Sequence, residues 1–100
     1  MTPKIYSISE IRAALLPIFY QYNVQRAILF GSYSKANATA QSDVDLLVDS
    51  GLRGLQFVGL SEDIREALDK NVDVFDVTHI EPHSKIDDEI RDTGVLIYEK

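Results

Sequence analysis

Two aspartates separated by one residue are the part of this sequence most suited to chemistry. Asp43 and Asp45 flank Val44 at the start of an apolar run that continues to Val48. Because successive side chains of a strand point to opposite faces, both carboxylates are expected on one face, with their Cα atoms about 6.5 to 7 Å apart. Hard oxygen ligands at this spacing suit Mg²⁺ or Mn²⁺, as one ion or as a pair.

A glycine and a serine precede this aspartate pair by ten residues. Gly31 and Ser32 follow the apolar run from Val24 to Phe30. Glycine lets the backbone approach a ligand closely, and a helical turn after it would offer free N–H groups and the Ser32 hydroxyl to an anion. Alone, Gly-Ser is usually a turn and Asp-Val-Asp is often a solvated strand edge. In this order and spacing, they indicate a phosphate site beside a metal site, as used in phosphoryl or nucleotidyl transfer.

Alternating helices and strands are expected to position these residues. Apolar periodicity predicts helices over 8–22, Leu55 to Leu68 and about His83 to Asp92. The first helix follows a capping box at Ser7-Ile8-Ser9-Glu10, and Pro17 is expected to kink or split it. The small polar residues after Ser32 allow a short helical turn near Ser34 to Ala38. Strands are predicted at Val24 to Phe30, Val44 to Val48, Val72 to Thr78 and Val95 to Tyr98. The order predicts an α/β (α+β) fold, a small mixed β-sheet packed by helices, as one domain over residues 1–100.

Composition narrows the class of protein. The 100 residues contain no cysteine, which excludes a disulfide framework and a thiolate zinc site. No apolar run reaches the roughly 20 residues of a membrane span, and the N-terminus lacks a signal-peptide pattern, so a cytoplasmic protein without membrane association is expected. A net charge of −6 argues against direct nucleic-acid binding. That charge also suits a basic protein partner, although it could serve solubility alone.

The interval from Gly31-Ser32 to Asp43-Val44-Asp45 resembles the signature of the DNA polymerase β-like nucleotidyltransferase superfamily, and in particular its minimal members, the MNT group. The resemblance covers nearly the whole chain, through the helix and strand expected over 55–78 to the ending at 94–99. It implies the polymerase β-like fold, ATP as substrate and Mg²⁺, with two ions expected. Gly31, Ser32, Tyr33 and Lys35 are then expected beside the nucleotide. One departure is Ser34-Lys35-Ala36-Asn37, where relatives commonly have a small residue, arginine, glycine and an acid.

The resemblance also implies a third catalytic and metal-binding carboxylate on a neighbouring strand, acting as the general base. Val72-Asp73-Val74 fits its flanking pattern best, and Phe75-Asp76-Val77 is the second candidate. Residues three apart point to opposite faces of a strand, so only one can face Asp43 and Asp45. We therefore expect the site to be Asp43, Asp45 and Asp73, with Asp76 as the alternative.

The same resemblance implies a partner and a reaction. Minimal members are commonly encoded beside a HEPN-domain protein, and the pair acts as toxin and antitoxin. The expected activity is transfer of AMP from ATP to a hydroxyl, most simply a tyrosine, of a HEPN ribonuclease toxin, which adenylylation (AMPylation) silences. The alternative is an antitoxin that acts by stoichiometric binding, with a weak or relict nucleotide site. A small-molecule adenylyltransferase is disfavoured, because these enzymes usually carry an extra helical domain for the acceptor.

Several points stay open or have simple interpretations. Two histidines, His79 and His83, are expected to be solvated rather than a metal pair. The acidic run Asp87-Asp88-Glu89 is expected to be the exposed face or first turn of a helix. The sequence leaves open the acceptor residue, the base preference, the number of AMP groups, and any homo- or hetero-oligomer.

Overall fold

A four-stranded sheet with the strand order β3-β2-β1-β4 forms the centre of the computed structural model, which describes residues 5–35, 38, 39 and 41–100. The strands are β1 (Arg26–Phe30), β2 (Val44–Asp49), β3 (Val72–Asp76) and β4 (Val95–Glu99). β1 runs antiparallel to both β2 and β4, whereas β2 and β3 are parallel. The predicted mixed sheet is confirmed.

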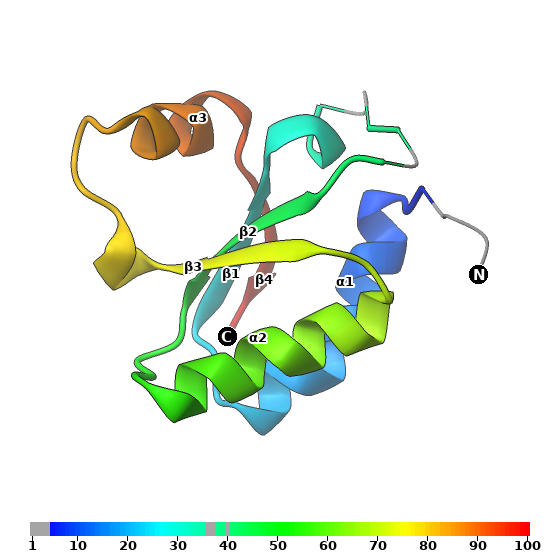
Figure 1. Cartoon of the computed structure of the whole chain (residues 1–100), viewed down its shortest axis with the longest axis vertical. Helices are drawn as coiled ribbons and strands as arrows, with labels where there is room; N and C mark the ends of the chain where they lie inside the picture. The colour runs from blue at the N-terminus through cyan, green and yellow to red at the C-terminus, as the bar shows by residue number, and fades with distance from the viewer. Residues whose placement is uncertain (1–4, 36–37, 40) are drawn as a thin grey trace.

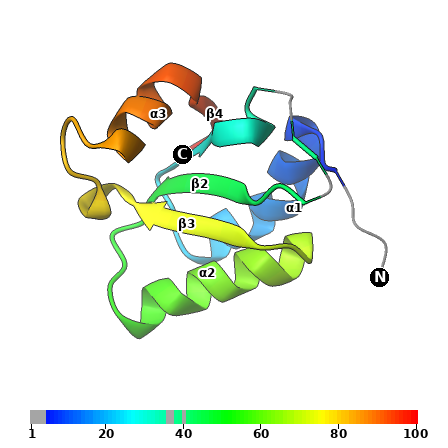
Figure 2. The ribbon, with the colours of Figure 1, turned by 45° about the horizontal axis from the view of Figure 1, so that its top comes forward.

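Two helices cover one face of the sheet and a third crosses the other (Figures 1 and 2). Helices α1 (Ile8–Gln21) and α2 (Leu55–Leu68) lie on the first face, and α3 (Lys85–Thr93) lies on the second. A capping box at Ser7 and Glu10 starts α1, as its spacing predicts. In the described part of the chain, no helix is long and apolar enough to cross a membrane.

The core lies between the sheet and the α1–α2 layer. Helix spacing brings one apolar stripe of each helix onto the sheet, and alternation brings every second strand residue to meet it. The side chains buried between these layers are Ile11, Leu15, Phe19, Leu60, Ile64 and Leu68 from the helices and Ala27, Leu29, Val44, Leu46, Val48 and Val72 from the strands. The opposite face is thinly covered, because α3 has no buried residue. Side chains on that face are therefore available for a site.

Some predicted boundaries were wrong. A 3₁₀ turn, η1 (Gly31–Tyr33), lies directly at the end of β1, before the helical turn expected near Ser34 to Ala38. Ala36 and Asn37, which belong both to this expected turn and to the loop that departs from the family pattern, lie outside the described residues, so the turn stays a prediction. Helix α1 continues through Pro17, which is exposed, so water can replace the hydrogen bond that proline cannot donate. β1 starts at Arg26 rather than Val24.

Strand β3 ends at Asp76, earlier than predicted, because Asp76 caps the 3₁₀ turn η2 (Val77–His79). Its side chain is 1% exposed and accepts hydrogen bonds from the backbone N–H and hydroxyl of both Ser50 and Thr78. Burial alone would raise the pKa of Asp76, but these four donors outweigh it and lower the pKa below its ordinary value. This carboxylate joins the ends of β2 and β3.

We predict that Asp76→Asn lowers the free energy of unfolding at pH 7 by about 1 to 3 kcal/mol, because an amide cannot accept from all four donors. A lowered pKa in the folded state stabilises the fold above the unfolded pKa and loses that effect as pH falls through the folded value. The difference between the wild type and Asp76→Asn should therefore shrink in acid, when both are followed by urea denaturation from pH 7 to pH 3. Asp92→Asn, at an exposed position, is the control; an equal loss in both variants would contradict the role of Asp76.

Candidate active site

The end of β1 meets the start of β2 at Gly31 and Asp45. Gly31 has a φ of +77°, and a Cβ at this position would lie 2.4 Å from Oδ2 of Asp45. Such an approach is closer than any real side chain allows. Glycine is therefore favoured here by the backbone conformation, and any other residue would displace the Asp45 carboxylate from its present position.

Three aspartates gather beside this contact. Register pairs Asp45 of β2 with Asp73 of the parallel strand β3, and Asp43 stands two residues before Asp45. Asp43 and Asp73 are exposed, whereas Asp45 is partly buried. Burial of the Asp45 side chain, followed by the charges of Asp73, Glu89 and Asp43, raises its pKa to about 6. The group thus concentrates negative charge that its own neighbours do not neutralise.

The structure separates the two candidates for the third carboxylate. Asp73 lies beside Asp45, whereas Asp76 pairs in register with Val48 and is buried on the helix-covered side of the sheet. Hydrogen bonds from Ser50 and Thr78 already occupy the Asp76 carboxylate. Of the two candidates, only Asp73 lies beside Asp45, and its role as the third carboxylate stays a prediction.

Helix α3 brings two residues to the site that the sequence analysis did not select. Oε1 of Glu89 lies 3.5 Å from the position a Gly31 Cβ would take, and its charge contributes to the raised pKa of Asp45. One turn later, the Thr93 hydroxyl accepts a hydrogen bond of 3.0 Å from the backbone N–H of Gly31. The available signal was their spacing of four residues at the end of a helix, which places both side chains on one face. Glu89 is exposed, as the sequence predicts, but its proximity to Gly31 was not predicted.

The residues predicted to contact the nucleotide differ in their placement. Ser32 is partly buried, and within the described residues its hydroxyl makes no hydrogen bond; Lys35 is exposed. Tyr33 is only 3% exposed and packs into the core, so its side chain does not face a ligand. Its hydroxyl is buried with no hydrogen-bond partner among the described residues. The backbone N–H and the hydroxyl of Ser34 both donate to the Gly31 carbonyl and close the turn.

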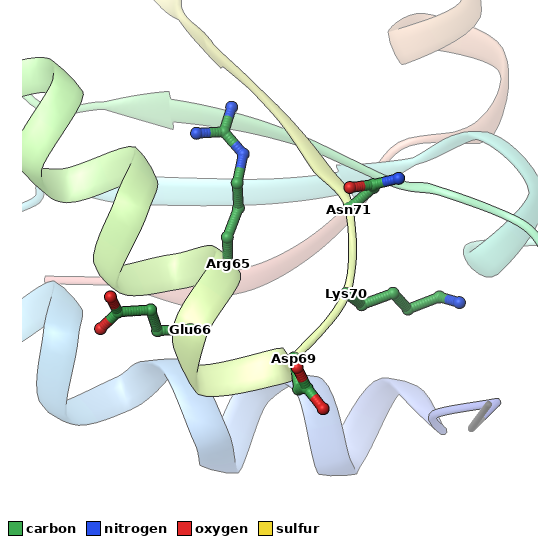
Figure 3. Close-up of a pocket in the computed structure, with 5 residues that line it drawn as sticks. All are labelled: Arg65, Glu66, Asp69, Lys70 and Asn71. Carbon is green, nitrogen blue, oxygen red and sulfur yellow. The ribbon is translucent and has the colours of Figure 1, made fainter. Parts of the chain in front are cut away.

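An arginine of α2 holds the start of the strand that carries Asp73. Nε of Arg65 donates to the Val72 carbonyl at 3.2 Å, and Figure 3 shows this side chain rising from α2 toward β3. The hollow around it, about 480 Å³, is lined by Arg65, Glu66, Asp69, Lys70 and Asn71. Lys70 extends away from α2 and lies over the Tyr33 ring, 5.8 Å from its centroid. Because two positive and two negative side chains line this hollow, it has no strong preference for an anion or a cation.

The donor set suits a divalent cation. Carboxylate oxygens are the ligands that Mg²⁺ prefers, and burial, followed by the charges of the neighbouring carboxylates, raises the pKa of Asp45, as expected for a site without a counterion. Within the described ranges, no group of three or more acidic, histidine or cysteine side chains is arranged closely enough to hold a metal ion, so a third ligand would require side-chain rotation. Asp43 and Asp73 are exposed, so packing does not prevent their side chains from rotating toward Asp45.

The histidines form no alternative metal site among the described residues. His79 was expected to be solvated; although exposed, its Nδ1 accepts a hydrogen bond from the Asp76 N–H, and its ring packs edge-on against Phe57 with centroids 5.0 Å apart. His83 is exposed in the turn before α3. The histidine nearest the sheet thus has a structural role.

Comparison with known proteins identifies the family of this chain. Residues 14–100 match the family model described as "Polymerase beta, Nucleotidyltransferase". The chain belongs to this family. A relative from Methanocaldococcus jannaschii, named "Putative protein adenylyltransferase MJ0435", is 37% identical over 78 residues, which cover 76% of this chain and 84% of that protein. The resemblance inferred from the glycine–serine pair and the aspartates is thereby confirmed, and the chain is a nucleotidyltransferase.

Solved structures show the same fold at low sequence identity. A toxin–antitoxin complex with AMP-PNP matches with a TM-score of 0.75 and 22% identity over 89% of this chain and 73% of that one. A complex of the tri-AMPylated HEPN toxin of Shewanella oneidensis with its MNT antitoxin matches with a TM-score of 0.70 and 20% identity, over 93% and 73% of the two chains. A structure described as a "putative minimal nucleotidyltransferase" matches with a TM-score of 0.72 and 22% identity, over 90% and 95%. These likenesses confirm the polymerase β-like nucleotidyltransferase fold.

We predict that Gly31→Ala displaces the Asp45 carboxylate in this nucleotidyltransferase. Gly51→Ala is the matched control, because Gly51 also has a positive φ, +69°, but nothing lies within 4 Å of its Cβ position. Both variants should lose about 1 to 2 kcal/mol of stability from the backbone strain. Only Gly31→Ala should also lose the binding of Mg²⁺ and ATP in calorimetric titrations. Equal binding by the two variants would show that the close approach has no part in the site.

We also predict that Asp45→Asn stabilises the protein when no divalent ion is present. At pH 8 with EDTA, the free energy of unfolding should rise by about 1 kcal/mol, because the variant removes a charge that burial and three carboxylates disfavour, while solvent at this partly exposed group screens part of the effect. A raised pKa in the folded state costs stability above the folded value, so the gain should shrink as pH falls through about 6. Asp49→Asn on the same face of β2 is the control. An unchanged or lower stability of Asp45→Asn, measured by urea denaturation, would contradict repulsion in the site.

Proposed function

We propose that this nucleotidyltransferase moves AMP from ATP to a side-chain hydroxyl of a partner protein. The observation that supports it most is the contact between the Gly31 backbone and the Asp45 carboxylate, with Asp73 next in register on β3. This contact puts a candidate phosphate loop against a candidate cation site. The name of the M. jannaschii relative, a protein adenylyltransferase, supports the choice of ATP and of a protein acceptor.

The proposed role of each residue follows from the chemistry and the position of its side chain. Asp43, Asp45 and Asp73 would hold Mg²⁺, with two ions expected, and the metal would neutralise charge on the phosphates. Ser32 would donate from its hydroxyl to a phosphate oxygen, and exposed Lys35 would add positive charge near the phosphates. Asp73 would accept the proton of the acceptor hydroxyl.

The transfer balances without any further reactant. The acceptor oxygen forms a bond to the α-phosphorus while the bond from that phosphorus to the bridging oxygen of the β-phosphate breaks. Pyrophosphate leaves, and the hydroxyl proton passes to the Asp73 carboxylate. The products are an adenylylated side chain and pyrophosphate.

The proposed acceptor is a tyrosine of a HEPN toxin, and the proposed role is that of its antitoxin. Structures that share this fold are described as toxin–antitoxin complexes, one of them with a tri-AMPylated HEPN toxin. A net charge of −6 favours association with a basic protein surface. The partner would present its hydroxyl to Asp73 on the thinly covered face of the sheet.

We predict that incubation with ATP, Mg²⁺ and the proposed HEPN-domain partner adds one or more AMP masses to that partner in intact-mass spectrometry. Asp43→Asn combined with Asp45→Asn should abolish the mass shift. Asp73→Asn should slow it by about 10²- to 10⁴-fold, the usual effect of losing a general base. Asp76→Asn and Asp49→Asn, which leave the three carboxylates in place, should retain the modification.

Two other outcomes would contradict this proposal. An unmodified partner that still forms a stable, inactive complex would make the chain an antitoxin that acts by binding. A mass shift that survives the double aspartate substitution would remove the carboxylates from the reaction. Peptide mapping of the modified protein identifies the acceptor residue and tests the choice of tyrosine.

A further inference from the structure

The last residue of α3 is bonded to the loop proposed to bind phosphate. The Thr93 hydroxyl accepts the N–H of Gly31 at 3.0 Å and donates to the Glu89 carbonyl at 2.7 Å. Both hydrogen-bonding directions of this hydroxyl are therefore used. The chain of bonds runs from the α3 backbone, through one side chain, to the backbone of the glycine at the centre of the site.

A second glycine makes this bond possible. A Cβ at Gly94 would lie 2.4 Å from the Ile90 carbonyl oxygen and 3.0 Å from Cγ2 of Ile28 on β1. Without that atom, the end of α3 lies directly against β1, and Gly94 donates its N–H to the Ile90 carbonyl. Thr93 is thereby brought within reach of the residue that follows β1.

The hydrogen bond between Thr93 and Gly31 contributes little to the stability of the core. Helix α3 has no buried residue, and a hollow of about 220 Å³ remains between it and the sheet, lined by Leu47, Val77, Ile80, Pro82, Asp87, Ile90 and Arg91. The core lies on the other face of the sheet, under α1 and α2 (Figure 2). A hydrogen bond at this place acts mainly on the conformation of the Gly31 loop.

We propose that Thr93 is a positioning residue for the nucleotide, acting through the Gly31 peptide; this inference rests on the proposed function. By accepting the Gly31 N–H, Thr93 fixes the direction of this peptide and withdraws that donor from the ligand. The backbone N–H and hydroxyl of Ser32, which make no hydrogen bond within the described residues, remain to meet the phosphates. The phosphate loop is therefore assembled from two parts of the chain, 62 residues apart.

Substitution of Thr93 tests the proposal. Thr93→Val keeps the shape of the side chain and removes the acceptor, so the Kd and KM for ATP with Mg²⁺ should rise about two- to tenfold, the value of one hydrogen bond, while kcat changes less than twofold. Thr93→Ser restores the hydroxyl and should return both constants to within twofold of the wild type. Asp92→Asn, exposed at the adjacent position of α3, should leave them unchanged. A purely structural role would lower the melting temperature of Thr93→Val and leave the KM for ATP unaltered.

Amide hydrogen exchange in the wild-type protein gives a readout without substitution. The Gly31 N–H should be protected before ATP and Mg²⁺ are added and should stay protected afterwards, whereas the Ser32 N–H should gain protection only with ATP and Mg²⁺. If Gly31 gains protection on addition of ATP, or if Thr93→Val binds ATP as the wild type does, the role of Thr93 is overturned and the proposed function stands. If the wild type binds no ATP with Mg²⁺, the proposed function and this inference both fail.

Discussion

The Asp45 carboxylate lies against the backbone of Gly31, in space that any other residue at position 31 would fill with its own Cβ. The rest of the site follows from this approach. Pairing of β1 with β2 sets Phe30 opposite Asp45, so the turn after Phe30 must pass over the carboxylate. Parallel pairing of β2 with β3 then adds Asp73 at the same level. Partial burial of Asp45 at this contact, followed by the charges of Asp73, Glu89 and Asp43, raises the pKa of its carboxyl group.

The face of the sheet covered by α1 and α2 stabilises the fold, whereas the open face carries the candidate catalytic residues. Aspartates on β3 show this division within one strand. Asp76 points to the covered face, where Ser50 and Thr78 satisfy its carboxylate and lower its pKa. Asp73 points to the open face, where its nearest neighbours include another carboxylate. Repulsion between neighbouring carboxylates lowers the stability of the fold, and a bound cation with a phosphate ligand would remove this repulsion. The energetics of the molecule thus match the function proposed for it.

Sequence patterns predicted the elements well where one periodicity dominated. The bounds of α2 agree with its apolar stripe, and the pairing of Asp43 with Asp45 on one face follows from strand geometry alone. Patterns failed where a single polar contact decided the structure. Asp76 ends β3 by capping η2, and Tyr33 turns into the core although it follows Ser32 directly. Glu89 and Thr93 reach the site through the packing of α3 on β1 beside Gly94, and their four-residue spacing predicts only that they share one face of the helix.

The central claim is that the carboxylates beside Gly31 hold a divalent cation together with ATP. Electron paramagnetic resonance of Mn²⁺, titrated into the protein with and without ATP, tests this most directly, because protein-bound and free Mn²⁺ give distinct signals. The structure predicts a bound Mn²⁺ signal that strengthens when ATP is present, and its loss in the Asp43→Asn and Asp45→Asn double variant. A Mn²⁺ signal that stays free at saturating protein and ATP, or one that is bound equally by the double variant, would contradict the assignment of this site.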